Sequence, residues 1–164
     1  MSHGSILVVN AGSSSLKFSL FRLDAAEALQ LAVRGQIDGI GSRPRLKVRD
    51  DADSILVERD LAPDEAREVK DAIAIAGGWL RERFPGEPLL AVGHRVVHGG
   101  ADYSRPVLVD DFVYAALEKL IPLAPLHEPH NLAAIRALLE TRPELPQVAC
   151  FDTAFHRAHP QLAD

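Results

Sequence analysis

The sequence has a single cysteine, few aromatic residues and no long hydrophobic run. Cys150 is the only cysteine in 164 residues, so an internal disulfide cannot form. No apolar run approaches the roughly 20 residues that span a bilayer. Residues 1–5 lack the basic segment followed by an apolar stretch that marks a secretory signal. We therefore expect a protein of the reducing cytoplasm with no membrane contact.

The sequence also lacks a strong excess of one charge. It has 18 lysines and arginines against 23 aspartates and glutamates, a formal net charge of -5. Acidic pairs such as Asp50-Asp51 and Asp110-Asp111 are spread among basic residues, so a general attraction for nucleic acid is not expected. The length and the 47% hydrophobic content suit one globular domain with a substantial core.

Short β-branched and alternating runs predict strands at 5–10, 16–21 and 31–37. The first two flank a glycine-containing turn, which is typical of an antiparallel hairpin. Two further short runs, 46–48 and 55–57, predict a small hairpin excursion. Strands are also expected at 89–97 and 147–155.

Apolar spacing of three and four predicts a helix over 64–84, and further helices are expected over 111–121 and 129–141. Strands come first and then alternate with helices. This order predicts an α/β fold with a mixed five-stranded sheet, in which an antiparallel meander is followed by parallel crossovers with flanking helices.

The first chemical candidate is the turn within NAGSSSLKFSLF, residues 10–21. It matches neither the P-loop pattern nor the dinucleotide-binding glycine pattern. The hydroxyls of Ser13, Ser14 and Ser15, with the charge of Lys17, could hold a phosphate, but an ordinary glycine and serine turn has the same composition. Asn10 at the strand end could orient a phosphate or a metal-bound water, or simply close the turn.

The second candidate is GHRVVHGG, residues 93–100, where a predicted strand runs into a Gly-Gly turn. The planar guanidinium of Arg95 can donate two parallel hydrogen bonds to a carboxylate or phosphate. His94 and His98 lie on one face of a strand, too far apart for easy joint metal ligation. A structural or hydrogen-bonding role is favoured for both histidines.

Two more candidates follow in LAPLHEPHN and VACFDTAFH. His127 precedes a predicted helix, where its ring could donate to an oxyanion, but His127 and Glu128 could equally be surface capping residues. Asp152 lies where an apolar strand ends, a position suited to magnesium, water or substrate in an open α/β sheet. The alternative is an aspartate that merely starts a turn.

These four segments, in this order, closely resemble the signature segments of acetate kinases. The resemblance covers nearly the whole chain and is weakest over 41–60. It implies an actin-like, ribonuclease H-like ATPase domain and reversible phosphoryl transfer from ATP to acetate, giving acetyl phosphate and ADP. It also implies magnesium or manganese as the cofactor.

The resemblance also implies roles for single residues. Asn10 is expected near the metal and phosphate, with Ser13, Ser14 and Lys17 in the phosphate loop. Arg95 is expected to hold the acetate carboxylate or the phosphoryl group in transfer. Val97 and Leu126 are expected to form two walls of the pocket for the acetate methyl group. His127 is expected to hydrogen-bond the phosphoryl group, and Asp152 to position substrate or to bind magnesium through water.

The chain departs from the family pattern in two ways. Glu128 stands where the family usually has asparagine, which is the better N-cap, and its carboxylate could repel phosphate unless it points into solvent. Residues 1–164 match only the N-terminal domain, with no positions for the C-terminal nucleotide-binding domain. We therefore expect negligible activity from the chain alone, with the missing domain or a homodimer partner completing the cleft. A noncatalytic phosphate- or partner-binding fragment and half of a propionate or butyrate kinase are the alternatives.

Overall fold

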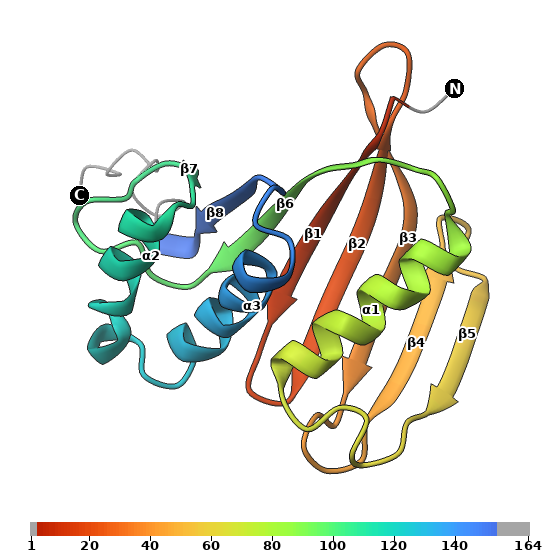
Figure 1. The fold of residues 1–164 in the computed structure, drawn as a ribbon, viewed down its shortest axis with the longest axis horizontal. Coiled ribbons are helices and arrows are strands. Elements are labelled where there is room, and N and C mark those ends of the chain that lie inside the picture. The colour runs from red at the N-terminus through yellow and green to blue at the C-terminus, as the bar shows by residue number, and fades with distance from the viewer. Residues whose placement is uncertain (1–2, 154–164) are drawn as a thin grey trace, which may run out of the picture.

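One mixed β-sheet runs through the molecule, and its helices pack on a single face (Figure 1). The structure, a computed structural model, describes residues 3–153. The strand order is β5-β4-β3-β2-β1-β6-β8-β7. The strands are β1 (Ser5–Ala11), β2 (Ser15–Leu23), β3 (Leu29–Asp38), β4 (Arg45–Asp50), β5 (Ile55–Asp60), β6 (Leu89–Val96), β7 (Val107–Leu108) and β8 (Gln147–Phe151).

The predicted α/β fold with a mixed sheet is confirmed, but the count of five strands is wrong, because the sheet has eight. The hairpin of β4 and β5 does not leave the sheet: β4 pairs antiparallel with β3 and extends the meander. Leu46 and Val48 alternate on its inner face and are fully buried, so burial of these side chains favours the continuous sheet. At the other edge β7 has two residues, too few to show an alternating pattern.

The helices are α1 (Val69–Arg83), α2 (Asp111–Glu118) and α3 (Glu128–Thr141), with a short 3-10 helix at Ile121–Leu123. All three predicted helices are present, and α1 begins five residues later than predicted. It starts after Glu68 because the Asp71 carboxylate accepts the backbone N–H of Glu68, a capping-box bond. The last strand ends at Phe151, and residues 154 and 155 of the predicted strand lie outside the described part.

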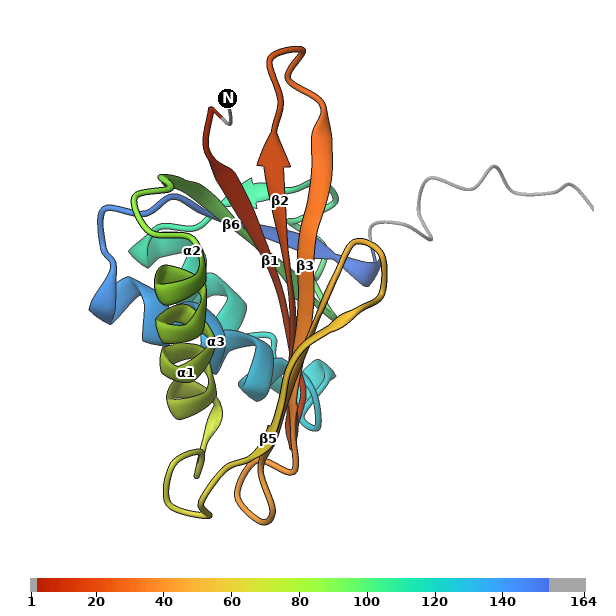
Figure 2. The ribbon, with the colours of Figure 1, turned by 90° about the vertical axis from the view of Figure 1, so that its right-hand side faces the viewer.

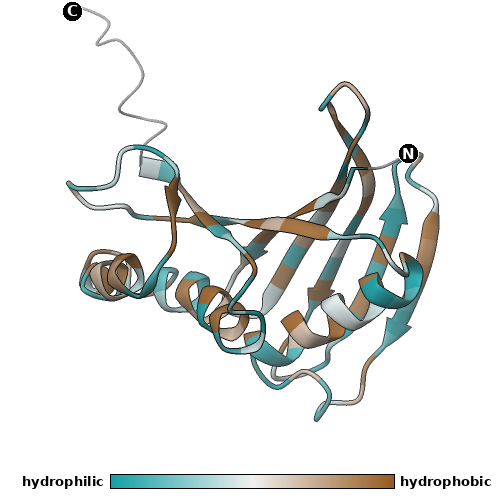
Figure 3. Ribbon diagram, turned by 45° about the horizontal axis from the view of Figure 1, so that its top comes forward, coloured by the Kyte–Doolittle hydropathy of each residue, from teal (hydrophilic) through white to brown (hydrophobic). Residues whose placement is uncertain are grey.

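Viewed along the sheet, α1, α2 and α3 all lie on the same side (Figure 2). Residues Leu7, Val9 and Ala11 of β1 point into the core beneath them, and Leu16 and Phe18 of β2 do the same. Hydrophobic stretches accordingly alternate with polar ones along the strands (Figure 3). Among residues 3–153, no helix covers the other face of the sheet, and none is long and apolar enough to cross a membrane.

His94 lies in the core and is paired there with Gln147. His94 on β6 is 2% exposed, and its Nε2 lies 2.7 Å from Oε1 of Gln147 on β8. Gln147 in turn donates to the carbonyl of Ile135 on α3. Burial lowers the pKa of His94 to about 4, so the imidazole is neutral at pH 7 and donates from Nε2 to the amide oxygen. The structural role predicted for His94 is confirmed.

Gly35 on β3 provides the first test of this packing. It lies opposite Phe18 on β2, and a Cβ at Gly35 would come within 2.3 Å of the Phe18 ring. We expect Gly35→Ala to lower the free energy of unfolding by about 1–3 kcal/mol, because an overpacked core must shift the ring. Gly93→Ala is the matched control, since a Cβ there meets no atom within 4 Å. Equal stabilities of the two variants in urea unfolding would contradict this packing.

Candidate active site at the carboxyl edge of the sheet

The carboxyl ends of three parallel strands meet at one edge of the sheet. β6 pairs parallel with β1 on one side and with β8 on the other. The Gly12 turn follows β1, the segment from Val97 to Gly100 follows β6, and Asp152 follows β8. In open α/β sheets, ligands bind outside this edge. The topology therefore brings together three of the four segments that the sequence singled out.

The serine loop is a tight hairpin turn, as predicted. Residues 12–14 join β1 to β2, and the amide of Gly12 donates to the carbonyl of Ser15 at 2.8 Å. That amide is therefore not available to a ligand. Ser13 and Ser14 are exposed, and Asn10 is half-buried opposite Lys17 across the hairpin. The loop thus offers two serine hydroxyls and the amides of residues 13 and 14 to an anion.

Lys17 lies on the uncovered face of the sheet, in a groove that also contains Arg34, Lys47 and Arg49. Both arginines pair with Asp53, and Lys47 pairs with a glutamate of β5. Within residues 3–153, no ion pair involves Lys17, so its charge can act on a ligand at the neighbouring serine loop.

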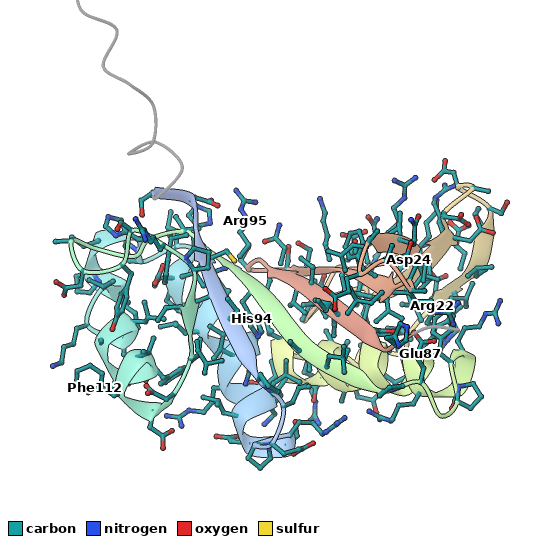
Figure 4. All side chains as sticks on the ribbon, turned by 90° about the horizontal axis from the view of Figure 1, so that it is seen from above. Arg22, Asp24, Glu87, His94, Arg95 and Phe112 are labelled. Atoms are coloured by element: carbon teal, nitrogen blue, oxygen red, sulfur yellow. The ribbon has the colours of Figure 1, made fainter. Side chains whose placement is uncertain are left out.

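Arg95 and Asp152 form a two-point ion pair. Nε of Arg95 lies 2.9 Å from Oδ1 of Asp152, and Nη2 lies 2.8 Å from Oδ2. These bonds raise the pKa of Arg95 above its ordinary value. Arg95 projects from β6 on the side away from the helices, whereas His94 points towards them (Figure 4). Asp152 occupies one edge of the guanidinium through Nε and Nη2, which leaves the N–H groups of Nη1 and one of Nη2 to donate to a ligand.

Asn131 in the first turn of α3 joins the ends of two of these strands. Its Oδ1 accepts the amide of Val97 at 3.0 Å, and its Nδ2 donates to the carbonyl of Ala11 at 2.7 Å. The side chain is 4% exposed. Asn131 was not among the predicted site residues. The signal that could have indicated it is an amide side chain within the first turn of a predicted helix, directly before the apolar Leu132.

The other predicted residues lie around the start of α3. His127 is the N-cap residue of α3, and its exposed side chain makes no capping hydrogen bond. Val97 is half-buried, whereas Leu126 is 75% exposed. Residues 3–153 therefore do not enclose Leu126, and the two-walled acyl pocket stays a prediction. His98 is held locally, since its Nδ1 accepts the amide of Gly100 at 2.7 Å.

Glu128 lies in a different environment from the one predicted. It is the first residue of α3 rather than its N-cap, and it is fully buried rather than a surface residue. Its Oε2 accepts the amide of His98 at 3.3 Å, and Oε1 has no hydrogen-bond partner among the described residues. Burial raises the pKa of Glu128 to about 7.

The site offers few metal ligands by itself. Residues 3–153 contain no group of three or more histidine, cysteine, aspartate or glutamate side chains that could hold a metal ion. The oxygen donors at the edge are the amide of Asn10, the serine hydroxyls and the carboxylate of Asp152. Magnesium usually retains several waters and binds through one or two protein oxygens plus substrate phosphates. This donor set is compatible with magnesium held in that way.

The acetokinase family model matches residues 5–164. The chain belongs to the acetokinase family. It is 54% identical over 160 residues to the acetate kinase of Nitrobacter hamburgensis, covering 98% of this chain and 39% of that relative. It is 50% identical over 159 residues to the acetate kinase of Rhizobium meliloti, covering 97% and 40%. The family resemblance found in the four segments is confirmed.

Solved structures of the family have the same fold. An acetate kinase from Porphyromonas gingivalis gives a TM-score of 0.83 at 32% identity. A propionate kinase from Francisella tularensis gives 0.82 at 35% identity. Each comparison covers 96% of this chain and 39% of the other. This acetokinase chain therefore spans about two fifths of the length of the relatives it matches.

Asn131 tests how the acetokinase edge is held together. We expect Asn131→Ala to lower the free energy of unfolding by about 2–4 kcal/mol, because a buried amide donor and a buried carbonyl acceptor both lose their partner. Glu140→Gln, at an exposed position on the same helix, is the control and should change the free energy of unfolding by less than about 0.5 kcal/mol. Urea unfolding measures both. A loss below about 0.5 kcal/mol in the alanine variant would rule out this role.

The two buried titratable groups make opposite contributions to stability. His94, with its pKa lowered from 6.5 to about 4, contributes stability above pH 6.5 that is lost as the pH falls towards 4. Glu128, with its pKa raised from 4.5 to about 7, contributes stability below pH 4.5 that is lost as the pH rises through 7. Between pH 4.5 and 6.5 the two contributions largely cancel.

Glu128→Gln removes the pH-dependent contribution of residue 128 to the free energy of unfolding. Between pH 4.5 and 6.5 we expect its free energy of unfolding to rise by about 3 kcal/mol more than that of the wild type, because only His94 then responds to pH. Urea unfolding at the two pH values measures this, and the comparison cancels the exposed carboxylates common to both proteins. Glu140→Gln, at an exposed position on α3, should behave as the wild type. The same dependence of unfolding free energy on pH in the wild type and in Glu128→Gln would show that His94 and Glu128 do not act in opposite directions.

Proposed function

We propose that this chain supplies the N-terminal half of the active cleft of an acetate kinase, which transfers the terminal phosphoryl group of ATP reversibly to acetate. The observation that supports this most strongly is that Asn131 ties the serine-loop strand to the Arg95 strand within an acetokinase chain. Phosphoryl transfer needs positioned charge more than covalent participation by the protein. An edge with exposed hydroxyls, the charge of Lys17 and the fixed guanidinium of Arg95 suits that requirement.

Each predicted residue has a role in this proposal. Ser13, Ser14 and Lys17 hold the phosphates of ATP. Arg95 binds the acetate carboxylate or the moving phosphoryl group through Nη1 and Nη2, the part of its guanidinium that Asp152 leaves open. His127, exposed at the N-terminus of α3, donates a hydrogen bond to the phosphoryl oxygens as charge develops on them.

The ion pair adds a role for Asp152 beyond the one implied by the family resemblance. A guanidinium on a flexible side chain loses conformational entropy when it binds a ligand. Asp152 fixes Nε and Nη2 of Arg95 before substrate arrives, so Asp152 acts as a positioning residue for Arg95. The second carboxylate oxygen keeps lone pairs that can still accept from a metal-bound water.

A divalent metal, magnesium or manganese, completes the proposal. Asn10 and Asp152 would approach it through oxygen, with Asn10 the predicted ligand, and the ion would neutralise charge on the phosphate oxygens. The protein's own contribution is to orient those two side chains at the ends of β1 and β8.

A further part of this proposal concerns the remainder of the cleft. We propose that 1–164 form an N-terminal domain and that a C-terminal nucleotide-binding domain, or a homodimer partner that brings one, binds the rest of ATP. The relatives have more than twice the matched length. The exposed Leu126 would then be covered, which completes the acyl pocket with Val97. We also propose a cytoplasmic location, which a single cysteine suits.

Propionate is the second candidate acceptor, because a propionate kinase matches this fold at 35% identity. One additional methylene changes binding in an apolar pocket by about 1–3 kcal/mol. In this proposal the wall that distinguishes the two acids includes Leu126, which residues 3–153 leave 75% exposed.

Arg95 provides the test of the proposed function. In this chain joined to the C-terminal part of an acetokinase relative, we expect Arg95→Ala to lower turnover of acetate and ATP at least about 100-fold. Arg95→Lys should recover only part of it, because the compact ammonium group lacks the planar fork that binds Asp152 through two nitrogens and leaves further N–H donors for a ligand. Circular dichroism confirms folding, and parallel assays with propionate and butyrate identify the acceptor. Near-normal turnover in folded Arg95→Ala would refute the proposal.

A further inference from the structure

The first turn of α3 contacts the strand that carries Arg95 at two successive backbone amides. Asn131 accepts the amide of Val97, and Glu128, three residues earlier on the same helix face, accepts the amide of His98. These amides directly follow β6. The position and direction of the Arg95 strand end therefore depend on two side-chain acceptors from one helix turn.

The surroundings of the Glu128 carboxyl do not suit a negative charge. The residue is fully buried, its one hydrogen bond is the 3.3 Å contact to His98, and Oε1 has no partner among residues 3–153. No ion pair to Glu128 occurs in the described part of the chain. A buried carboxylate with one hydrogen bond would cost several kcal/mol, and the N-terminus of α3 offsets only up to about 2 kcal/mol of that.

The titratable groups near Glu128 in the chain and at the facing strand end do not neutralise it. His127 and His130 flank it at the start of α3, and His98 follows β6, where its backbone amide bonds to Glu128. Arg95 projects from β6 to the side away from the helices and pairs with Asp152. β1, α1 and α2 make no ion pair with Glu128 in the described structure.

We propose that Glu128 is a positioning residue for the Arg95 strand end and that it performs this role as an uncharged carboxylic acid. Oε2 then acts as the carbonyl oxygen that accepts from His98, and the proton resides on Oε1, where the burial of an unpartnered anionic oxygen is avoided. Glu128 thus reproduces the acceptor of a neutral amide without adding a charge beside His127. An anion can therefore bind at this edge although the helix begins with a glutamate.

The carboxyl of Glu128 stays protonated only over a limited pH range. Because burial raises the pKa of Glu128 to about 7, the carboxyl ionises as the pH rises above that value. The new charge lies next to His127 and repels any anion held by the site. This consequence rests on the proposed function. Binding of phosphate-like anions should weaken above pH 7 when residue 128 can ionise. In a variant whose residue 128 cannot ionise, this weakening should be absent.

The experiment compares wild type, Glu128→Gln and Glu128→Leu, with Glu140→Gln on the exposed face of α3 as the matched control. Glutamine keeps a neutral acceptor for the His98 amide, and leucine removes it. Three readouts are followed by NMR on the 164-residue chain: the carboxyl carbon of Glu128 against pH, amide protection at Val97 and His98, and binding of sulfate, whose charge is constant between pH 6 and 8.5.

We expect the Glu128 carboxyl to titrate near 7. His98 protection should fall about tenfold in the leucine variant at pH 6 and stay at the wild-type level in the glutamine variant, while Val97 protection, which depends on Asn131, changes little in both. Between pH 6 and 8.5, sulfate affinity should fall about fivefold more in the wild type than in Glu128→Gln. Glu140→Gln should show the same fall as the wild type.

Two results would overturn the proposal: a Glu128 carboxyl that titrates near its ordinary value of 4.5, or His98 protection that is the same in the leucine and glutamine variants. The sulfate readout separates this proposal from the proposed function. If sulfate fails to bind the wild type, the anion site at Arg95 is wrong, but carboxyl titration and amide protection still decide the role of Glu128.

Discussion

The side chain of Asn131 makes two hydrogen bonds on which the geometry of the edge depends. One end of its amide binds the backbone after β6 and the other binds the last residue of β1. The serine loop begins one residue after Ala11, and Arg95 lies two residues before Val97. Because the amide is planar and buried, it fixes the distance between two strand ends that carry separate parts of the proposed site. Strand pairing sets the register of β1 and β6, and α3 sets how their ends diverge.

Desolvation favours the neutral form of both buried titratable groups in the described structure, and that property connects the core with the site. His94 is neutral because it is desolvated, and Glu128 is favoured in its neutral form for the same reason. The charged pair, Arg95 and Asp152, lies instead on the exposed side of the edge. The charges of this pair thus lie where a ligand can reach them. The two buried groups respond to pH in opposite directions, which reduces their joint effect on stability in mildly acidic conditions.

The sequence was informative where a local pattern determined the structure. The hairpin around Gly12, the three helices and the final strand follow from alternation, three-and-four spacing and turn residues. The Arg95–Asp152 pair could not be read from the sequence, because 57 positions separate the partners and only the β6–β8 pairing brings them together. The burial of Glu128 was missed because glutamate before Pro129 is typical of an exposed first turn. The strand count was wrong because the alternation of Leu46 and Val48 did not reveal which sheet would bury them.

The serine loop and Arg95 form one anion site if the proposed function is right. Titration of the isotope-labelled chain with inorganic phosphate decides this. The signals of the Ser13 and Ser14 amides and of the Nε–H of Arg95 should shift together with one dissociation constant, while the amides of β4, beside the groove that contains Lys47 and Arg49, should not move. Shifts confined to β4, or different midpoints for the loop and for Arg95, would show that the two do not form one site.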